Sequence, residues 1–332
     1  MHTNSLKRTA WNFRPLGLGL IALALCGPTC AQTKWPGNTA VKILVGNAPG
    51  GASDNLARAL ALEMSRKLDH PVIVENVSGA HGAQAAQKVL AAEPDGQTLL
   101  FGSTSDLVVL PLTTRQAGYQ PSDFTAIAKI SSSPMVLVAR PNLSSRTVHE
   151  IIEVARGHPQ KLSMGTTYER SVQSLAASAF MRTAKVEMAL VRYRGGAPIL
   201  EDLSQGRLDL AVLTLPSVLR QARTGKIRII GLMTPNRVAM APEVPTLSES
   251  YTIGGISMLV WVGMAGPPKL PPAVVTQINK VIGDVLADPK FGAARLEAGD
   301  ILEPPAPSTV FAQFIEDEAA FYRTLLRFLP SP

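Results

Sequence analysis

Short apolar runs alternate with amphipathic segments along most of the chain. Residues 41–45 form an apolar run that predicts a buried strand. After a glycine-rich turn, Leu56, Leu60 and Met64 recur every four residues and predict a helix from about residue 54 to residue 68. By the same patterns we expect strands at residues 72–75, 98–101, 136–139, 188–193, 208–213 and 227–232, and helices at residues 83–92, 148–156, 172–182, 198–204 and 218–224. The C-terminal part has a Gly/Pro-rich strand region near residues 261–268 and two helices, near residues 272–287 and 308–328.

This order of elements predicts an α/β fold with two lobes, each a mostly parallel sheet flanked by helices. Short apolar strands separated by helices favour a parallel sheet that is covered on both faces. Roughly 300 residues follow the first 31, and this is more than one typical domain holds. We expect a first lobe at residues 32–133, a second lobe at residues 134–256, and a return to the first lobe at residues 257–332.

The first 31 residues have the organisation of an export signal. Three basic residues, Lys7, Arg8 and Arg14, precede an apolar run at residues 16–25, which is too short to span a bilayer comfortably. Thr29 and Ala31 occupy the −3 and −1 positions of a cleavage site. We therefore expect a signal peptide at residues 1–31, cleaved near Ala31, and a mature protein in the periplasm that does not itself span the membrane.

A lipid anchor is the alternative to plain cleavage. Cys26 or Cys30 would then become an acylated N-terminus, but neither follows the small residue that such a signal needs. Plain cleavage removes both cysteines and three basic residues, which lowers the formal net charge from +7 to +4. A mature chain without cysteine has no disulfide, thiol nucleophile or thiolate metal site. The mild positive charge, without long basic runs, suits a small anionic ligand and argues against nucleic acid as a partner.

A glycine-rich turn joins the first predicted strand to the first predicted helix. It contains Asn47, Ala48, Pro49, Gly50, Gly51 and Asp54. Glycines allow a tight turn and a close approach of the backbone to a ligand, and the first turn of a helix has unpaired N–H groups and a partial positive charge. This arrangement favours a bound anion. Glycines for turn geometry alone are the alternative, and Asp54 can either cap the helix or accept a hydrogen bond from the ligand.

Polar loops also follow four later strands or extended segments. Ligands of open α/β sheets bind at the carboxyl ends of the strands, so these loops are candidates for one shared cleft. Their hydroxyl, amide and guanidinium groups donate hydrogen bonds to carboxylate oxygens. The candidate ligand-binding residues in these loops are Ser103, Thr104, Ser105, Thr166, Thr167, Arg192, Tyr193 and Thr214. Arg192 and Arg194 lie on the same side of a strand, so either of them could face the ligand or form a surface ion pair.

Constellations of catalytic or metal-binding residues are weakly supported. The four histidines that remain after cleavage are not spaced as paired metal ligands on a helix, and His81 reads as a solvent-facing residue of a turn. The sequence has no G-x-S-x-G elbow, no P-loop and no G-x-G-x-x-G after the first strand. We therefore expect no catalytic residue, metal or cofactor.

Several segments together resemble one family over nearly the whole mature chain. They are Ala48-Pro49-Gly50-Gly51-Ala52-Ser53-Asp54, residues 74–82, residues 94–100, and Tyr193-Arg194-Gly195-Gly196-Ala197-Pro198. In this order and spacing they are similar to the periplasmic solute-binding proteins of tripartite tricarboxylate transporters, the Bug receptors. The resemblance implies a Venus-flytrap fold with a cleft for a small carboxylate. It also implies that the loops 47–54 and 103–105 hold one carboxylate, while the second lobe sets specificity.

The sequence departs from the pattern of this family mainly in the second lobe. The resemblance places Asn47 where an aromatic residue is usual and Thr214 where Asn is common. Tyr168 and Arg170 replace glycines, Ser174 stands where His is common, and Arg192 replaces a proline. The second-lobe loop with Arg192 is therefore expected to select the molecule that carries the carboxylate.

The functional expectation is a monomeric exported receptor that captures a small organic acid and delivers it to membrane permease subunits of a tripartite transporter. Ligand would favour a closed state because it contacts both lobes. A ligand-binding component of a signalling receptor is an alternative, and an exported enzyme is a further one. The sequence leaves open which carboxylate is bound and how many carboxyl groups it has.

Overall fold

The computed structural model describes His2 and residues 35–47, 49–50, 52–167, 171–193, 195–249 and 256–327. The predicted signal peptide (residues 1–31, His2 apart) lies outside the described residues, as do Ala48, Gly51, Tyr168, Arg170 and Arg194. The strands are β1 (Val41–Val45), β2 (Val72–Asn76), β3 (Thr98–Ser103), β4 (Thr125–Ala139), β5 (Ser163–Thr166), β6 (Ala189–Arg192), β7 (Leu210–Thr214), β8 (Arg228–Leu232) and β9 (Leu259–Gly266).

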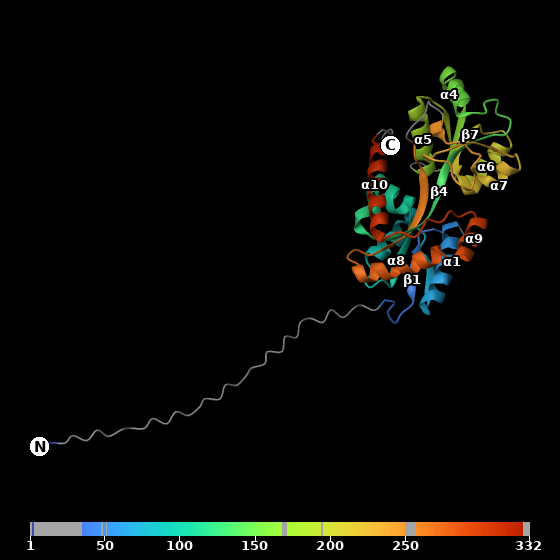
Figure 1. Cartoon of the computed structure of the whole chain (residues 1–332). Coiled ribbons are helices and arrows are strands. Elements are labelled where there is room, and N and C mark those ends of the chain that lie inside the picture. The colour runs from blue at the N-terminus through green and yellow to red at the C-terminus, as the bar shows by residue number, and fades with distance from the viewer. Residues whose placement is uncertain are drawn as a thin grey trace. The chain divides into compact units, whose positions relative to one another are not determined.

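Helices lie between most of these strands and follow the last one (Figure 1). The α-helices are α1 (Ala52–Leu68), α2 (Ala83–Leu90), α3 (Leu110–Thr113), α4 (Val148–Gly157), α5 (Val172–Ala184), α6 (Gly196–Ser204), α7 (Leu215–Arg223), α8 (Pro272–Leu286), α9 (Pro289–Glu297) and α10 (Ser308–Leu326). A π-helical turn at Thr104–Val109 leads into α3. Short 3₁₀ turns lie at Ala80–Gly82, Arg115–Ala117, Pro121–Asp123 and Leu247–Glu249.

The nine strands form one continuous sheet in which β4 changes its partners halfway along. Strand order is β2-β1-β3-β9-β4-β7-β5-β6, and β8 also pairs with β4. Residues of β4 up to Pro134 pair with β9, and from Met135 onward the strand pairs with β7 and β8. We call β1, β2, β3, β9 and the first part of β4 the first half-sheet, and the remaining strands with the second part of β4 the second half-sheet.

The predicted α/β fold is confirmed, and the strand pairing is mixed. β1 is parallel to β2 and β3, and β5 is parallel to β6 and β7. The pairs that involve β4 or β9 are antiparallel. The antiparallel centre contains β9, which comes from the C-terminal part of the chain and lies between β3 and β4.

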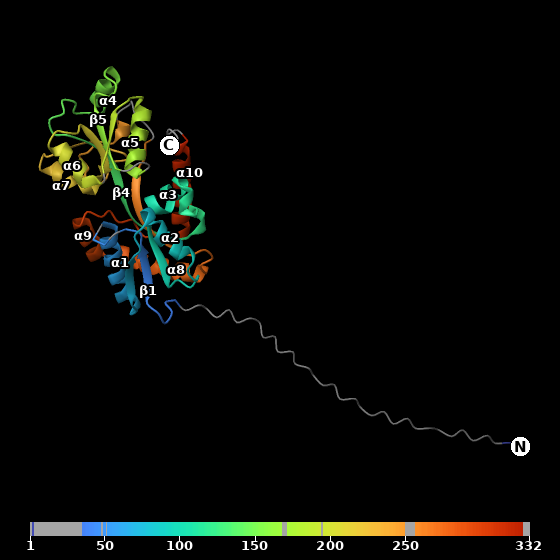
Figure 2. The ribbon, with the colours of Figure 1, turned by 180° about the vertical axis from the view of Figure 1, so that it is seen from behind.

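Helices cover both faces of the sheet, and alternation along the strands decides which core each side chain joins. Ile43 and Val45 pack with α1 and α8, whereas Leu44 between them points to the opposite face. On that opposite face one buried cluster includes residues of both half-sheets together with α2, α4, α5 and α10. Helices α6 and α7 cover the other face of the second half-sheet, and Figure 2 shows these layers from behind. Burial on both faces explains the near-continuous apolar strands.

Strand β4 is the main element that pattern reading placed incorrectly. The sequence predicts a strand only at residues 136–139, whereas β4 begins at Thr125. Ser131, Ser132 and Ser133 precede Pro134, and such a run is typical of a loop. Here the run pairs with β9, and Ser132 also donates its N–H to the Ile301 carbonyl (3.0 Å) and its hydroxyl to Glu303.

Two helices in the described residues were not predicted. Helix α9 begins directly after Asp288, whose carboxylate accepts the N–H groups of Lys290 (2.8 Å) and Phe291 (3.3 Å). The pair Asp288-Pro289 is a recognisable N-cap and N1 signal. The π-helical turn and α3 follow Ser103, and Asp106 three residues later is the matching capping signal.

Candidate functional site

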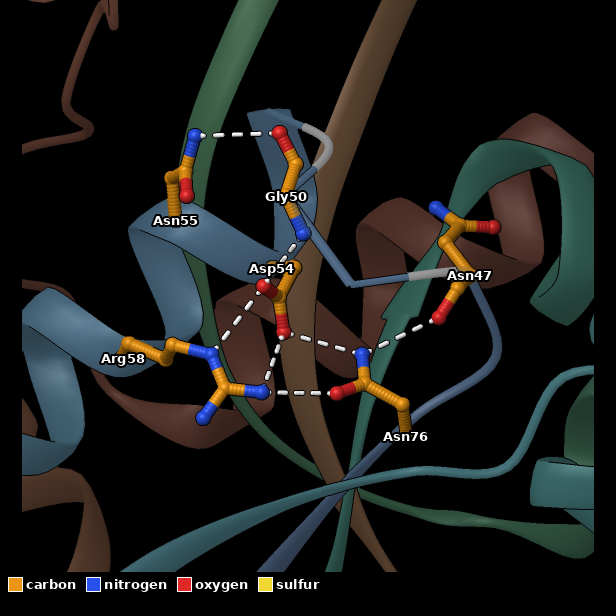
Figure 3. A network of polar contacts seen from close by, with 6 residues as sticks. All are labelled: Asn47, Gly50, Asp54, Asn55, Arg58 and Asn76. Carbon is orange, nitrogen blue, oxygen red and sulfur yellow. Dashed lines mark hydrogen bonds and ion pairs between the residues drawn. The ribbon is translucent and has the colours of Figure 1, made fainter.

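A network of polar side chains forms hydrogen bonds with the glycine-rich turn after β1 (Figure 3). Asn76, the last residue of the neighbouring β2, donates to the Asn47 carbonyl (3.0 Å). Asp54 accepts the Gly50 N–H (2.8 Å), and Asn55 donates to the Gly50 carbonyl (3.3 Å). The turn is therefore anchored at both its start and its end by α1 and β2.

Asp54 is the centre of this network and is almost fully buried. Its Oδ2 also accepts from Arg58 Nε (3.0 Å), and its Oδ1 accepts from Asn76 Nδ2 (2.9 Å) and lies 3.0 Å from Arg58 Nη2. Mainly because of the Arg58 hydrogen bond, the pKa of Asp54 is lowered to about 2. The carboxylate is thus ionised at neutral pH and is engaged by four donor contacts within the protein.

Two expectations about this turn need correction. Helix α1 begins at Ala52, so Asp54 lies in its first turn and reaches back to Gly50; it does not cap the helix from outside. The Gly50 N–H was expected to point at an anion, but it is donated to Asp54. Gly50 itself has a φ of 84°, and a Cβ added there would meet no atom within 4 Å. Its exposed Cα surface therefore remains open to close approach by a ligand.

The second polar loop follows β3, which lies beside β1 in parallel. Asp106 is buried and accepts both the Ser103 N–H and the Ser103 hydroxyl (3.0 Å for the hydroxyl). Burial raises the pKa of Asp106 to about 6. A Cβ at Gly82 would come within 2.9 Å of the Asp106 Cβ, and one at Gly46 would come within 2.7 Å of the Gly82 Cα. Three loops at the carboxyl edge of the first half-sheet thus meet around Asp106.

Thr104 and Ser105 have different surroundings, although both were predicted to contact ligand. Thr104 is fully buried, and its hydroxyl accepts the Trp261 N–H (2.9 Å) and lies 3.5 Å from the Trp261 carbonyl. It therefore fastens the loop to β9 through its side chain. Ser105 is half-buried and lines a cavity at the surface of this loop. Ser103 and Ser105 are the better placed of the three for contact with a ligand.

The carboxyl edge of the second half-sheet contains Thr166, Thr167, Arg192 and Thr214. Thr166 pairs with Arg192 across β5 and β6, and both Thr166 and Thr167 are buried. The Thr167 hydroxyl donates to Ser171 Oγ (2.7 Å), which in turn caps α5 by accepting the Ser174 N–H (3.1 Å). Thr167 therefore positions the start of α5.

Arg192 ends the edge strand β6 of this half-sheet, and Tyr193 follows it. Arg192 is exposed, and Tyr193 is half-buried with its hydroxyl donated to Asp202 of α6 (2.7 Å). Burial and the Asp202 carboxylate raise the pKa of Tyr193 to about 12. Thr214 is half-buried at the start of α7, and its carbonyl accepts the Ser217 hydroxyl (2.7 Å). Arg194, the other arginine considered for ligand contact, lies outside the described residues.

Strand register brings the polar edges of the two half-sheets to the same stretch of β4. Ser103 pairs with Val262, and Val262 pairs with Ser131 of β4. Thr214 pairs with Met135, four positions further along β4, so the two β4 residues Ser131 and Met135 are about 13 Å apart. Helix α5 also contacts the π-helical turn of the first half-sheet. The two sets of loops therefore lie on either side of the point where β4 changes partners.

Helix N-termini add a favourable field at these edges. Helices α1, α5, α6 and α7 all begin in the loops that follow β1, β5, β6 and β7. The N-terminal turn of a helix carries unpaired N–H groups and a partial positive charge. Both edges are thus suited to an anion.

The sequence reading missed three residues that build this site. Asn76, Arg58 and Asp106 were not among the predicted site residues. Asp106 had a readable signal in the Ser103-x-x-Asp106 spacing. The roles of Asn76 and Arg58 had none, because they depend on contacts between β2 and α1 that are distant in sequence.

Two general features of the described part of the chain bear on the chemistry. No group of three or more His, Cys, Asp or Glu side chains there is arranged to hold a metal ion. In the same part, no helix combines the length and the apolar character that crossing a bilayer requires.

Comparison with known proteins identifies the family. The sequence pattern described as "Tripartite tricarboxylate transporter family receptor" matches residues 56–329. The UPF0065 protein in the tcbD-tcbE intergenic region of Pseudomonas sp. strain P51 is 30% identical over 279 residues, which cover 84% of this chain and 82% of that protein.

Solved structures agree with this assignment. R. palustris Rpa4515, determined with adipate, has a TM-score of 0.75 and 28% identity, over 89% of this chain and 98% of that one. The periplasmic binding protein BugD has a TM-score of 0.71 and 27% identity, over 87% and 96% of the two chains. The fold is therefore the Venus-flytrap fold of periplasmic binding proteins, and the chain belongs to the solute-binding receptor family of tripartite tricarboxylate transporters.

Proposed function

We propose that this protein is a periplasmic receptor that captures a small organic carboxylate between the two halves of its sheet and delivers it to the membrane permease of a tripartite transporter. The observation that carries the proposal is the register of β4, in which Ser131 aligns through Val262 with Ser103 and Met135 pairs with Thr214, so the polar edges of the two half-sheets face each other across four positions of β4. The adipate-bound Rpa4515 supports a carboxylate as the ligand class.

The first half-sheet would hold one carboxylate. The anchored turn at residues 47–50 leaves an open approach at Gly50, and Ser103 and Ser105 lie in the adjacent loop. Asp54 and Asp106 accept backbone N–H groups of these loops and so hold their shape. A loop that is already ordered binds with a smaller entropic cost than one that must be ordered by the ligand.

The second half-sheet would contact the remainder of the ligand and drive closure. We propose lobe boundaries at residues 32–133, 134–256 and 257–332, because β4 exchanges β9 for β7 and β8 between Pro134 and Met135. Thr166, Thr167, Arg192, Tyr193 and Thr214 then belong to the second lobe. A ligand that touches both lobes stabilises the closed state by its differential affinity for that state.

A ligand screen tests this function. The protein without residues 1–31 is mixed with mono-, di- and tricarboxylates, and its melting temperature and calorimetric Kd are measured. We expect at least one acid to bind with a Kd in the micromolar range or below and to raise the melting temperature in a concentration-dependent way. Loss of uptake of that acid in cells without the gene tests the delivery step. Turnover of a compound, or no binding by any acid, would contradict the proposal.

The glycine turn gives a sharper test. Gly50→Leu places a side chain on the open face of the turn, and we expect the affinity for the identified acid to fall at least tenfold. Gly206→Leu is the matched control, since Gly206 also has a positive φ (75°) and open space around it but lies after α6. Both variants should lose about 1–2 kcal/mol of stability through left-handed backbone strain. Equal affinities for the two variants would remove Gly50 from the site.

A further inference from the structure

A cavity of about 460 Å³ opens beside the second polar loop. Its walls combine apolar and polar side chains from the first half-sheet with Ser171 at the start of α5. Residues that line it include His81, Ser105, Val109, Leu110, Ala117 and Ser171. Pockets of this size hold organic ligands with mostly apolar bodies and a few polar anchors. Ser105 belongs both to this cavity and to the loop assigned above to a carboxylate.

His81 lines the cavity and lies in a turn whose backbone is strained. Gly79, Ala80, His81 and Gly82 all have positive φ values, and those of Ala80 and His81 are 45° and 57°. Left-handed backbone costs a residue other than glycine roughly 1–2 kcal/mol, and residues strained in this way cluster at functional sites. The turn is wedged in place, because Gly82 packs against both Gly46 and Asp106. The imidazole is exposed at the cavity wall.

We propose that this cavity is a side chamber of the ligand site, that it takes the apolar body of an extended or aromatic dicarboxylate, and that His81 binds the distal carboxylate. The inference rests on the proposed function, since it takes Ser105 as the neighbour of the first carboxylate. Imidazole N–H groups donate hydrogen bonds to carboxylate oxygens. Val109, Leu110 and Ala117 supply the apolar wall against which a chain or ring packs.

Chain length provides the first test. Affinities are measured by calorimetry for linear α,ω-diacids from succinate upward and for the three benzenedicarboxylates. Each methylene that enters the chamber should lower Kd about fourfold until the chamber is filled. Kd values that do not change with the size of the body, among acids that do bind, would overturn the chamber and leave the proposed function standing. Failure of every acid to bind would overturn both.

His81→Gly separates a ligand role from a structural one. Glycine relieves the left-handed strain, so this variant should melt at a higher temperature than the wild type. Its affinity for the best diacid should nevertheless fall about tenfold, and its affinity for a monocarboxylate of the same body should not change. Gln160→Gly, at an exposed residue with a φ of 60°, is the control that should gain stability without any change in affinity. Unchanged diacid affinity in His81→Gly would overturn the assignment of His81.

Filling the chamber gives an independent result. Thr113 lines the cavity and its hydroxyl donates back to the Val109 carbonyl (2.9 Å). Thr113→Phe should weaken binding of long or aromatic diacids at least tenfold while succinate is affected less than threefold. Thr276→Phe is the control, because Thr276 makes the same kind of back-bond (2.9 Å to the Pro272 carbonyl) on the exposed side of α8. Equal losses for succinate and for the longest diacid would contradict a chamber.

Discussion

Asp54→Ala is expected to weaken carboxylate binding more than tenfold and to lower the free energy of unfolding by about 2–3 kcal/mol. The buried carboxylate orders the glycine turn through the Gly50 N–H and links it to Arg58 and Asn76. Its removal leaves the Gly50 N–H without its acceptor, takes from the Asn76 amide one of its two acceptors, and releases the turn. Chemical denaturation and calorimetry with the identified acid measure the two effects.

The control for Asp54→Ala is Asp284→Ala. Asp284 also forms an i,i+4 ion pair, with Lys280, but on the exposed surface of α8. Exposed pairs contribute about 0.3–0.5 kcal/mol, so Asp284→Ala should change stability by no more than that and leave affinity as it is. If Asp54→Ala bound the acid with wild-type affinity at a ligand concentration that keeps it folded, the turn would not be part of the site.

The titration of Asp54 also predicts how the free energy of unfolding changes at acidic pH. Its pKa is about 2 in the folded chain and 3.8 in the unfolded one, so the unfolded chain binds more protons between these values. The stabilisation is complete above pH 4 and is lost as the pH falls toward 2. It amounts to at most about 2 kcal/mol, because one pKa unit corresponds to about 1.4 kcal/mol and Arg58 is half exposed to solvent.

Asp106→Asn is expected to remove a pH dependence of stability whose sign is opposite to that of the Asp54 contribution. Burial raises the pKa of Asp106 to about 6, above the value of 3.8 in the unfolded chain. The folded protein therefore binds the proton more tightly, and its stability falls as the pH rises from about 4 to about 6. The full change is on the order of 2–3 kcal/mol. Denaturation curves of both proteins across this range measure the difference in slope.

Asn can keep the local geometry at position 106, since its carbonyl oxygen can accept the Ser103 N–H and hydroxyl as Asp does. Asp123→Asn is the matched control, because Asp123 accepts the Gln120 N–H (2.8 Å) three residues before it but is exposed. Burial also raises the pKa of Glu318 and of Asp300. Both residues remain in all these proteins, so their contributions to the pH dependence cancel in the comparison. Identical pH slopes for the wild type and Asp106→Asn would show that Asp106 is not the titrating group.

Local sequence signals predicted most elements because those elements are stabilised by local rules. The four-residue repeat of Leu56, Leu60 and Met64 placed α1 correctly, and all three are buried. The run Val41–Val45 was located to the residue. The cleft itself was proposed from the rule that ligands bind at the carboxyl ends of strands, and the loops after β1 and β3 do lie side by side.

The detailed use of each polar residue was not predictable in the same way. Thr104 and Ser105 are adjacent hydroxyl residues in one loop, yet Thr104 is tied to Trp261, 157 positions away, while Ser105 lines a cavity. Asp54 could be read as a cap or as a ligand contact, and it proved to be the internal anchor of the turn. A hydroxyl or carboxylate has several possible partners, and only the packing of distant segments determines which one it meets.

The sequence by itself determined the class of fold, the family, most helices and strands, and the loops that could hold an anion. These follow from apolar periodicity, turn residues and motif order, which depend on neighbours along the chain. Tertiary structure alone decided that β4 runs through the Ser131–Pro134 segment, that Asp54 and Asp106 lie beneath the loops, and that His81 borders a cavity. Each of these depends on burial and on contacts between segments far apart in sequence, and the apolar pattern of one segment does not encode its distant partner.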